Sequence, residues 1–297
     1  MGAKLRVVRR RIRSVQSTKK ITRAMELIAS SRIVRAQQRV EASRPYAVQL
    51  TRAMEDVARQ TGAVAHPLLE ERDPVSRAGV FIATSDRGLA GSYNANVLKV
   101  GEELMRAIRA RGLDPVVYVS GKKGVGYFRF RGVPVRNSWQ GFSEVPPYEK
   151  AEEIGRALIE DFSAGEIDEL YGAYTDFRSA FTLRATSQRF LPIAPEEVSG
   201  TELRPVHAEY LFEPEPAQIL DQLLPQYVVT KVYAALLESA ASENAARRRA
   251  MKAATDNAED LIKILTRQAN RARQDEITTE ISEIVGGAEA LSASSEG

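Results

Sequence analysis

The sequence predicts an α/β domain that lies between two long helices, which pair with each other as an antiparallel coiled coil. Two observations carry this prediction. Residues 3–61 contain no glycine and a single proline, and residues 226–285 contain neither. Between them, residues 76–212 alternate short apolar runs with helical stretches, which is typical of a largely parallel sheet. The predicted parts are an N-terminal helix over 1–62, the α/β domain over 76–212 and a C-terminal helix over 214–291.

The N-terminal helix is predicted from apolar residues that recur at steps of three and four. Its first stripe consists of Leu5, Val8, Ile12, Val15, Ile21, Met25 and Ile28. A second run fits the two apolar positions of a heptad and consists of Val40, Ala47, Leu50, Met54 and Val57. Pro45 lies inside this segment and predicts a bend, and Gly62 predicts the end of the helix.

The C-terminal helix carries two stripes that differ in phase. The first consists of Met251, Ala254, Ala258, Leu261, Leu265 and Ala272, and the second of Ile277, Ile281, Ile284, Ala288 and Leu291. A helix over 214–286 is about 110 Å long at ~1.5 Å per residue, more than the α/β domain can cover. Because an uncovered amphipathic helix is unstable in water, we expect it to pair with the N-terminal helix. Its longer end then projects without that partner, and the last six residues read as a disordered tail.

The pattern of the long helices leaves one alternative open, in which both are ordinary surface helices of one compact fold.

The middle of the chain is predicted in more detail. Strands are expected over 79–85, 115–121, 131–139, 171–177, 181–193 and 207–212, with helices over 94–111 and 148–162. This order predicts a right-handed, largely parallel sheet with an antiparallel addition late in the chain.

The charge of the chain is distributed unevenly. Residues 1–44 contain 13 Lys and Arg against two Glu, a balance of +11, whereas the whole chain carries +3. The N-terminal segment therefore favours an anionic partner, which is a nucleic acid, an anionic lipid or an acidic protein surface. Residues 1–45 contain no aromatic side chain on which a base could stack. A solvated or protein-facing helix is therefore the favoured interpretation of this segment.

No cofactor, metal or catalytic site is predicted. The chain has no cysteine and two histidines far apart, so thiolate chemistry and a clustered metal site are not expected. The segment SDRGLAGSYN (85–94) follows the first strand but lacks both phosphate-loop and dinucleotide fingerprints, and favours a tight glycine turn. The segment GKKGVG (121–126) is interpreted as a turn that exposes two lysines rather than as an anion site at a helix start.

Four stretches resemble the gamma subunits of F-type ATP synthases, in the order found in that family. They are IRSVQSTKKITRAMELIASSR (12–32), SDRGLAGSYN (85–94), SENAARRRAMKAATDNA (242–258) and ITTEISEIVGGAEAL (277–291). The resemblance covers nearly the whole chain. It implies a Rossmann-like α/β domain at the foot of a coiled-coil shaft, and a rotor that couples proton-driven rotation of the c-ring to ATP synthesis and regulates ATPase activity and proton flow.

The resemblance also implies partners and site residues. The shaft is expected inside the hexamer of alpha and beta subunits, and the foot against the epsilon subunit and the c-ring. The contacts to the beta subunit fall on Arg273, Gln274 and Thr278. The tip in the apolar bearing of the hexamer is formed by Ile277, Ile281, Ile284 and Leu291. Acidic neighbours are expected for the basic shaft, represented by Lys19, Lys20 and Arg23.

The implied subunit is not itself an enzyme and does not span the membrane. It is expected as a peripheral protein on the cytoplasmic side of the cell membrane, of the bacterial type because the match begins near residue 2. The missing cysteines exclude the thiol regulation of some plastid members. Two rival functions remain: a nucleotide-binding α/β enzyme with helical appendages, and a coiled-coil protein that binds nucleic acid through its basic arm.

Overall fold

The computed structural model describes residues 2–61, 66–179, 182–194 and 215–295. The strand expected over 207–212 and the helix end expected at Gly62 lie outside these residues. The chain divides into two compact units, each of which takes part of both long helices, α1 (Gly2–Thr61) and α6 (Pro216–Ser295).

The larger unit spans Ala29–Arg247 and contains a five-stranded sheet. Its strands are β1 (Arg77–Ala83), β2 (Asp114–Ser120), β3 (Val135–Trp139), β4 (Glu169–Phe177) and β5 (Leu183–Leu191). They lie in the order β3-β2-β1-β4-β5, in which only the β4–β5 pair is antiparallel. The central strand β1 is buried along nearly its whole length, as expected for a parallel strand covered on both faces. The predicted sheet, with its late antiparallel addition, is confirmed.

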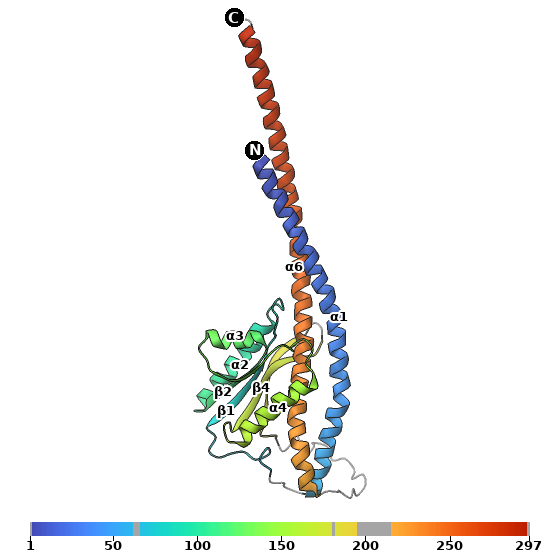
Figure 1. Cartoon of the computed structure of the whole chain (residues 1–297), viewed down its shortest axis with the longest axis vertical. Helices are drawn as coiled ribbons and strands as arrows, with labels where there is room; N and C mark the ends of the chain where they lie inside the picture. Colours follow the sequence, from blue (N-terminus) through green and yellow to red (C-terminus); the bar gives the residue numbers. More distant parts are fainter. Residues whose placement is uncertain (1, 62–65, 180–181, 195–214, 296–297) are drawn as a thin grey trace. The chain divides into compact units, whose positions relative to one another are not determined.

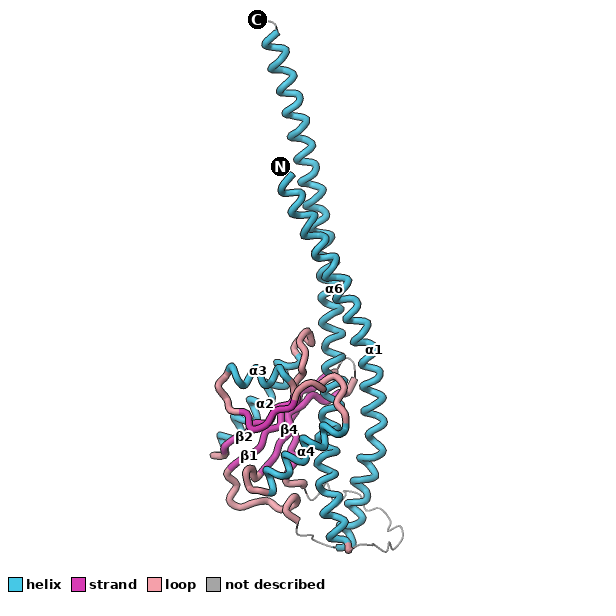
Figure 2. Tube along the Cα trace, viewed as in Figure 1, coloured by secondary structure: helices cyan, strands magenta, loops and turns pink. Residues whose placement is uncertain are grey.

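Helices cover both faces of this sheet (Figure 1, Figure 2). On one face, α2 (Tyr93–Ala110) and α3 (Lys122–Phe130) pack over a core that includes Val80, Ile82 and Phe128. On the other face, α4 (Tyr148–Ser163) and α6 pack over a second core, which α1 joins through Leu50, Met54 and Val57. The helix α1 is a single continuous helix that contains Pro45.

The helix α3 was not predicted, since residues 121–126 were interpreted as a turn. Its two glycines lower helix propensity, but the packing requires one of them. A Cβ at Gly124 would lie 2.6 Å from Val119 and 2.8 Å from Thr84. Just before the helix, Gly121 adopts a φ of +97°, and a Cβ there would lie 2.2 Å from the carbonyl oxygen of Thr84. Glycine therefore lets the chain turn sharply from β2 into α3.

The smaller unit consists of Met1–Ile28 and Arg248–Gly297. Here α1 and α6 run antiparallel, because Lys19 pairs with Glu259 at 3.0 Å and Thr22 with Thr255 at 2.8 Å. The α6 side of the seam is as predicted, with Met251, Ala258 and Leu265 buried. The predicted coiled-coil pairing is confirmed.

The α1 side of this seam differs from the prediction after Val15. The residues of α1 that face α6 continue the heptad spacing through Lys19, Thr22 and Glu26, which are partly or fully buried. Ile21 and Ile28, which were predicted to face α6, are 61% and 53% exposed. The prediction followed the apolar residues, but the two threonine hydroxyls hydrogen-bond across the seam and hold the original phase. As a result, an apolar face of α1 points away from α6.

The far end of α6 has no described part of α1 opposite it. The register of the pair places Gly2 opposite about residue 275, and α6 continues to Ser295 through Gly286 and Gly287. The predicted tail is therefore helical as far as the structure describes it, and its expected disorder from residue 292 was wrong there. The projecting helix end predicted from the sequence is confirmed.

Candidate functional site

The loops after β1, β2 and β3 meet at the carboxyl edge of the sheet, next to the point where the strand order reverses between β1 and β4. The first of these loops is the segment 85–94. Ser85 and Asn94 close it, since the Ser85 N–H donates to Asn94 Oδ1 at 2.9 Å and Asn94 Nδ2 to Ser85 Oγ at 2.8 Å. Positive φ values occur at Gly91 and at Leu89. The predicted tight turn is confirmed, although Gly88 is not one of its positive-φ residues.

Asp86 joins the three loops to one another. Its carboxylate accepts the backbone N–H groups of Lys122 at 3.1 Å, Gly141 at 2.8 Å and Ser143 at 3.0 Å. The Asp86 N–H in turn donates to Ser143 Oγ at 2.9 Å. Burial acts to raise the pKa of this carboxyl group, but the backbone donors outweigh burial, so its pKa lies below the ordinary value. Asp86 is therefore an ionised acceptor that fixes the loop after β3.

Glu144 follows Ser143 in that loop and pairs with three arginines from three different segments. Its carboxylate lies 3.3 Å from Arg247 of α6 and 3.6 Å from Arg87 of the first loop, and it also pairs with Arg32 of α1. The Glu144 side chain is 16% exposed. One half-enclosed carboxylate therefore connects the α/β sheet to both long helices.

Arg247 makes further contacts in this group. Its guanidinium donates to Glu243 Oε1 at 2.6 Å and to the Gly88 carbonyl at 3.3 Å. Burial raises the pKa of Glu243, and Arg247 opposes this shift. We call the five charged residues the Glu144 cluster, which consists of Arg32, Arg87, Glu144, Glu243 and Arg247.

The sequence reasoning missed this cluster although it had found most of its parts. Its three arginines come from the stretches 12–32, 85–94 and 242–258, one from each. Glu144, the residue that they share, lies outside all quoted stretches. A local signal existed only for Glu243 and Arg247, which have the i, i+4 spacing of a helical ion pair.

The predicted basic residues of the shaft gather in the smaller unit. Lys19, Lys20 and Arg23 line a groove of about 740 Å³ together with Leu27 and Ile262. Two of the three cations are paired inside the chain, Lys19 with Glu259 and Arg23 with Glu26 at 2.8 Å. The groove is thus lined by basic and apolar side chains, and part of its charge is already compensated.

The predicted tip residues lie on the part of α6 beyond the register of α1. Ile277, Ile281 and Ile284 are 44%, 55% and 72% exposed and share one face of the helix. Arg273 lies one turn before Ile277 on that face. The other polar residues predicted there are also exposed, namely Gln274 and Thr278. The side chain of Leu291 lies outside the described side chains.

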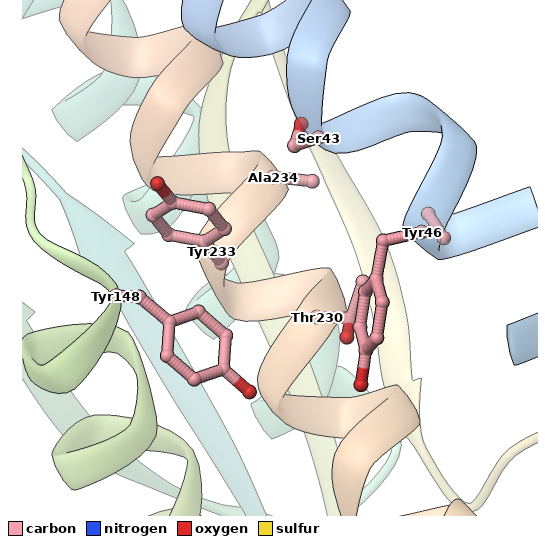
Figure 3. A pocket seen from close by; sticks show the side chains of 7 residues that line it. Ser43, Tyr46, Tyr148, Thr230, Tyr233 and Ala234 are labelled. Carbon is pink, nitrogen blue, oxygen red and sulfur yellow. The ribbon is translucent and has the colours of Figure 1, made fainter.

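A pocket of about 340 Å³ opens between α1, α4 and α6 (Figure 3). Its lining residues are Ser43, Tyr46, Ala47, Tyr148, Thr230, Tyr233 and Ala234. Tyr148 and Tyr233 meet edge to face at 5.4 Å, and the Tyr148 hydroxyl donates to Gln226 at 3.0 Å. Burial raises the pKa of Tyr148, and the lining side chains are aromatic, hydroxyl or methyl groups.

The described residues include neither a metal-binding group nor a membrane-spanning helix. Over these residues, no three His, Asp or Glu side chains lie close enough together to hold a metal ion. None of the helices that the structure describes combines the length and apolarity needed to cross a bilayer.

A family model described as ATP synthase matches residues 4–291. The ATP synthase gamma chain of Acidothermus cellulolyticus is 57% identical over 297 residues, covering 99% of each chain. That of Mycolicibacterium smegmatis is 53% identical over 308 residues, covering 99% of this chain and all of its own. These matches confirm the resemblance found in the four sequence stretches.

The fold also resembles chains of solved ATP synthase rotors. A chain of the Euglena gracilis mitochondrial rotor aligns with a TM-score of 0.66 at 15% identity, covering 93% of this chain and 100% of its own. A chain from the central stalk and c-ring structure of the Tetrahymena thermophila enzyme aligns at 0.58 and 24% identity, covering 79% and 99%. The fold is shared, and by its sequence the chain belongs to the ATP synthase gamma chain family.

Proposed function

We propose that the chain is the central shaft of a bacterial ATP synthase and carries out no bond chemistry itself. The observation that carries the proposal is the free end of α6, where isoleucines are exposed on a helix beyond the register of α1. Three exposed isoleucines along one helical face favour an enclosing apolar surface. In a gamma chain that surface is the inside of the hexamer of alpha and beta subunits.

The partners follow from the relatives. The solved chains of similar fold belong to structures described as rotor, as central stalk with c-ring, and as F1 with c-ring. We assign the same surroundings to this chain: the alpha and beta subunits around the paired helices, and the epsilon subunit and c-ring near the Rossmann-like domain. The complex is then peripheral to the cytoplasmic side of the cell membrane. Proton-driven rotation of the ring turns the shaft and drives ATP synthesis, and the shaft regulates ATPase activity and proton flow.

The working parts differ from the compact units. We propose a shaft of residues 1–62 and 214–291 and a domain of residues 76–212, whereas the compact units divide both helices near Ile28 and Arg247. Rotation needs continuous helices that transmit twist. The continuity of α1 and α6 across that division therefore supports the functional division over the compact one.

Three groups of residues are assigned to contacts with the hexamer. Arg273, Gln274 and Thr278 bind the beta subunit, since exposed polar side chains beside an apolar stripe suit a mixed protein surface. The bearing is formed by Ile277, Ile281, Ile284 and Leu291. The basic groove with Lys19, Lys20 and Arg23 faces acidic side chains of the hexamer, because its remaining positive charge attracts them.

Reconstitution tests this proposal. Alpha and beta subunits are assembled with the full chain, or with a matched chain that ends at residue 276 and lacks the exposed tip. The full chain is expected to form a stable complex with sustained ATP turnover and rotation of a bead fixed to the domain. The shortened chain is expected to bind more weakly. Sustained ATP hydrolysis by the isolated chain, or failure of the full chain to join the hexamer, contradicts the proposal.

A further inference from the structure

We propose that Glu144 is the residue through which the α/β domain holds both long helices against twist. This inference rests on the proposed function as a shaft, and it assigns the transfer of torque between domain and helices to one loop carboxylate. Glu144 forms ion pairs with Arg32 of α1 and with Arg247 of α6. Arg247 is the last residue of the larger unit, and Arg32 lies three residues after its first residue, Ala29.

The Arg32–Glu144 ion pair lies far along α1 from the apolar contacts that begin at Leu50. The α1 residues in the core shared with α4 and α6 begin at Leu50, 18 residues after Arg32, and the α1 residues Ala29, Ile33 and Ala36 beside Arg32 are also buried. At ~1.5 Å per residue the two points of attachment are about 27 Å apart along the helix. A helix that is held at two such points cannot pivot about either one. The ion pair to Glu144 therefore adds a directional contact near the boundary of the unit, beside the buried residues Ala29, Ile33 and Ala36.

The loop that carries Glu144 is itself fixed to the sheet. Asp86, three residues after β1, accepts the N–H groups of Gly141 and Ser143, and its own N–H donates to Ser143 Oγ. Arg247 also donates to the carbonyl of Gly88 in the same loop as Asp86. A force on Glu144 thus passes through short hydrogen bonds into β1, the buried central strand.

The chemistry of the contact suits a mechanical role better than a stabilising one. Apolar packing is non-directional, whereas arginine–carboxylate pairs have a defined geometry. Arg247 and Glu243 are 5% and 0% exposed, so they lose hydration on folding, and such buried pairs add little net stability. Displacing one partner, however, leaves a charge in a poorly hydrated site. The cluster therefore resists a change of geometry more than it favours folding.

The test compares Glu144→Gln with Glu169→Gln in the full chain, assembled into the proton-translocating complex. Glu169 is a matched control, because it forms two hydrogen bonds to Arg111 at 2.7 and 2.8 Å and is similarly enclosed, but joins β4 only to the end of α2. Proton pumping per ATP hydrolysed and the torsional stiffness of the rotor are measured, together with the melting temperature of the free subunit.

We expect Glu144→Gln to lower the pumping ratio and the stiffness by at least about twofold, the lower end of single-residue coupling effects. The melting temperature should change no more than in Glu169→Gln, whose pumping ratio stays at the wild-type level. Arg32→Gln should reduce stiffness in the wild type and add little in the Glu144→Gln background. If Glu144→Gln does not assemble, Arg32→Gln alone decides, because its partly exposed side chain can be replaced without burying a charge.

Three outcomes are distinguished. Wild-type pumping and stiffness in both Glu144→Gln and Arg32→Gln overturn this inference and leave the proposed function intact. Equal losses in Glu144→Gln and Glu169→Gln also overturn it, because they show a general loss of domain stability. If the wild-type chain itself supports neither assembly nor pumping, the proposed function has failed.

Discussion

The guanidinium of Arg247 donates to the carboxylate of Glu243 at 2.6 Å, one turn apart on α6, and both side chains are almost fully buried. Glu243 Oε2 has no hydrogen-bond partner within the described structure. Burial raises the pKa of Glu243, and Arg247, followed by Ser143, opposes this shift by favouring the ionised form. The two residues are thus energetically dependent on each other.

The first prediction concerns this dependence. Arg247→Met should lower the free energy of unfolding of the free subunit by about 3–5 kcal/mol, because Glu243 is left buried without its partner. Adding Glu243→Gln should recover most of that loss. Urea unfolding of wild type, both single variants and the double variant provides the measurement. Strictly additive effects of the two substitutions would show that the residues do not depend on each other.

The second prediction concerns Glu238 of α6, whose pKa is affected by the charges of Asp176 of β4 and Arg44 of α1. Burial, followed by the charge of Asp176, raises its pKa to about 7, while Arg44 opposes the shift. The folded state therefore binds more protons than the unfolded state between about pH 4.5 and 7. This contribution to stability is fully present below pH 4.5 and is lost as the pH rises through 7.

Glu238→Gln should accordingly be more stable than wild type at pH 8 by about 1–2 kcal/mol, allowing for the partial exposure of the site, and nearly equal to it at pH 4.5. Melting temperatures of the free subunit across this range give the measurement. Glu283→Gln, at an exposed position on the same helix, is the control. A stability difference that does not vary with pH would exclude the titration of Glu238 as its cause.

The third prediction concerns the polar residues near the tip of α6. Arg273→Ala combined with Gln274→Ala should leave the free subunit folded, because both side chains are exposed. In the assembled complex, each charge-assisted bond lost from Arg273 contributes roughly 1.5–3 kcal/mol, so ATP turnover should fall about tenfold or more. Circular dichroism and steady-state ATPase assays measure the two effects. Unchanged assembly, turnover and pumping would remove both residues from the mechanism.

The fourth prediction concerns the basic groove. Replacing Lys19, Lys20 and Arg23 with glutamine should weaken coupling to the hexamer more than it weakens folding. The Lys19–Glu259 pair lies at the surface, where such a pair contributes about 0–1 kcal/mol. In the second pair Arg23 is exposed, whereas Glu26 is largely buried. The matched control replaces three exposed cations of α3, Lys122, Lys123 and Arg129, with glutamine.

Pumping ratio and melting temperature are measured for both triple variants. We expect a loss of pumping in the groove variant alone. A collapse of the melting temperature in the groove variant would show that these charges serve the fold. Equal losses of pumping would show that net charge, rather than its place on α1, matters.

The sequence predicts the helices and strands that are determined by patterns of neighbouring residues. Long stretches without glycine or proline are sufficient to predict α1 and α6, and alternating patterns are sufficient for the sheet. The prediction failed where packing outweighed propensity. Glycines at 121 and 124 suggested a turn, although close contacts with Thr84 require them at the start of α3. On α1, apolar residues suggested a seam through Ile21, whereas the phase is set by Thr22 and its partner on α6.

The candidate site was harder to predict for a related reason. Arg32 and Glu144 are 112 residues apart in sequence, and no periodicity connects a helix residue with a loop residue. The role of Glu144 depends on where the loop after β3 ends, which in turn depends on Asp86. Only the folded arrangement of three loops places that carboxylate between two helices.

The hydrogen bonds of Asp86 have a consequence for ligand binding at the carboxyl edge of the sheet. In nucleotide-binding α/β proteins, backbone N–H groups at the carboxyl edge of the sheet, beside the reversal of strand order, hold the phosphates of a ligand. Here the N–H groups of Lys122, Gly141 and Ser143 at that edge are occupied by a carboxylate of the chain itself. Asp86 is thus a built-in substitute for a bound anion. An edge that holds a diffusible ligand in nucleotide-binding folds is thus filled here by the chain's own carboxylate.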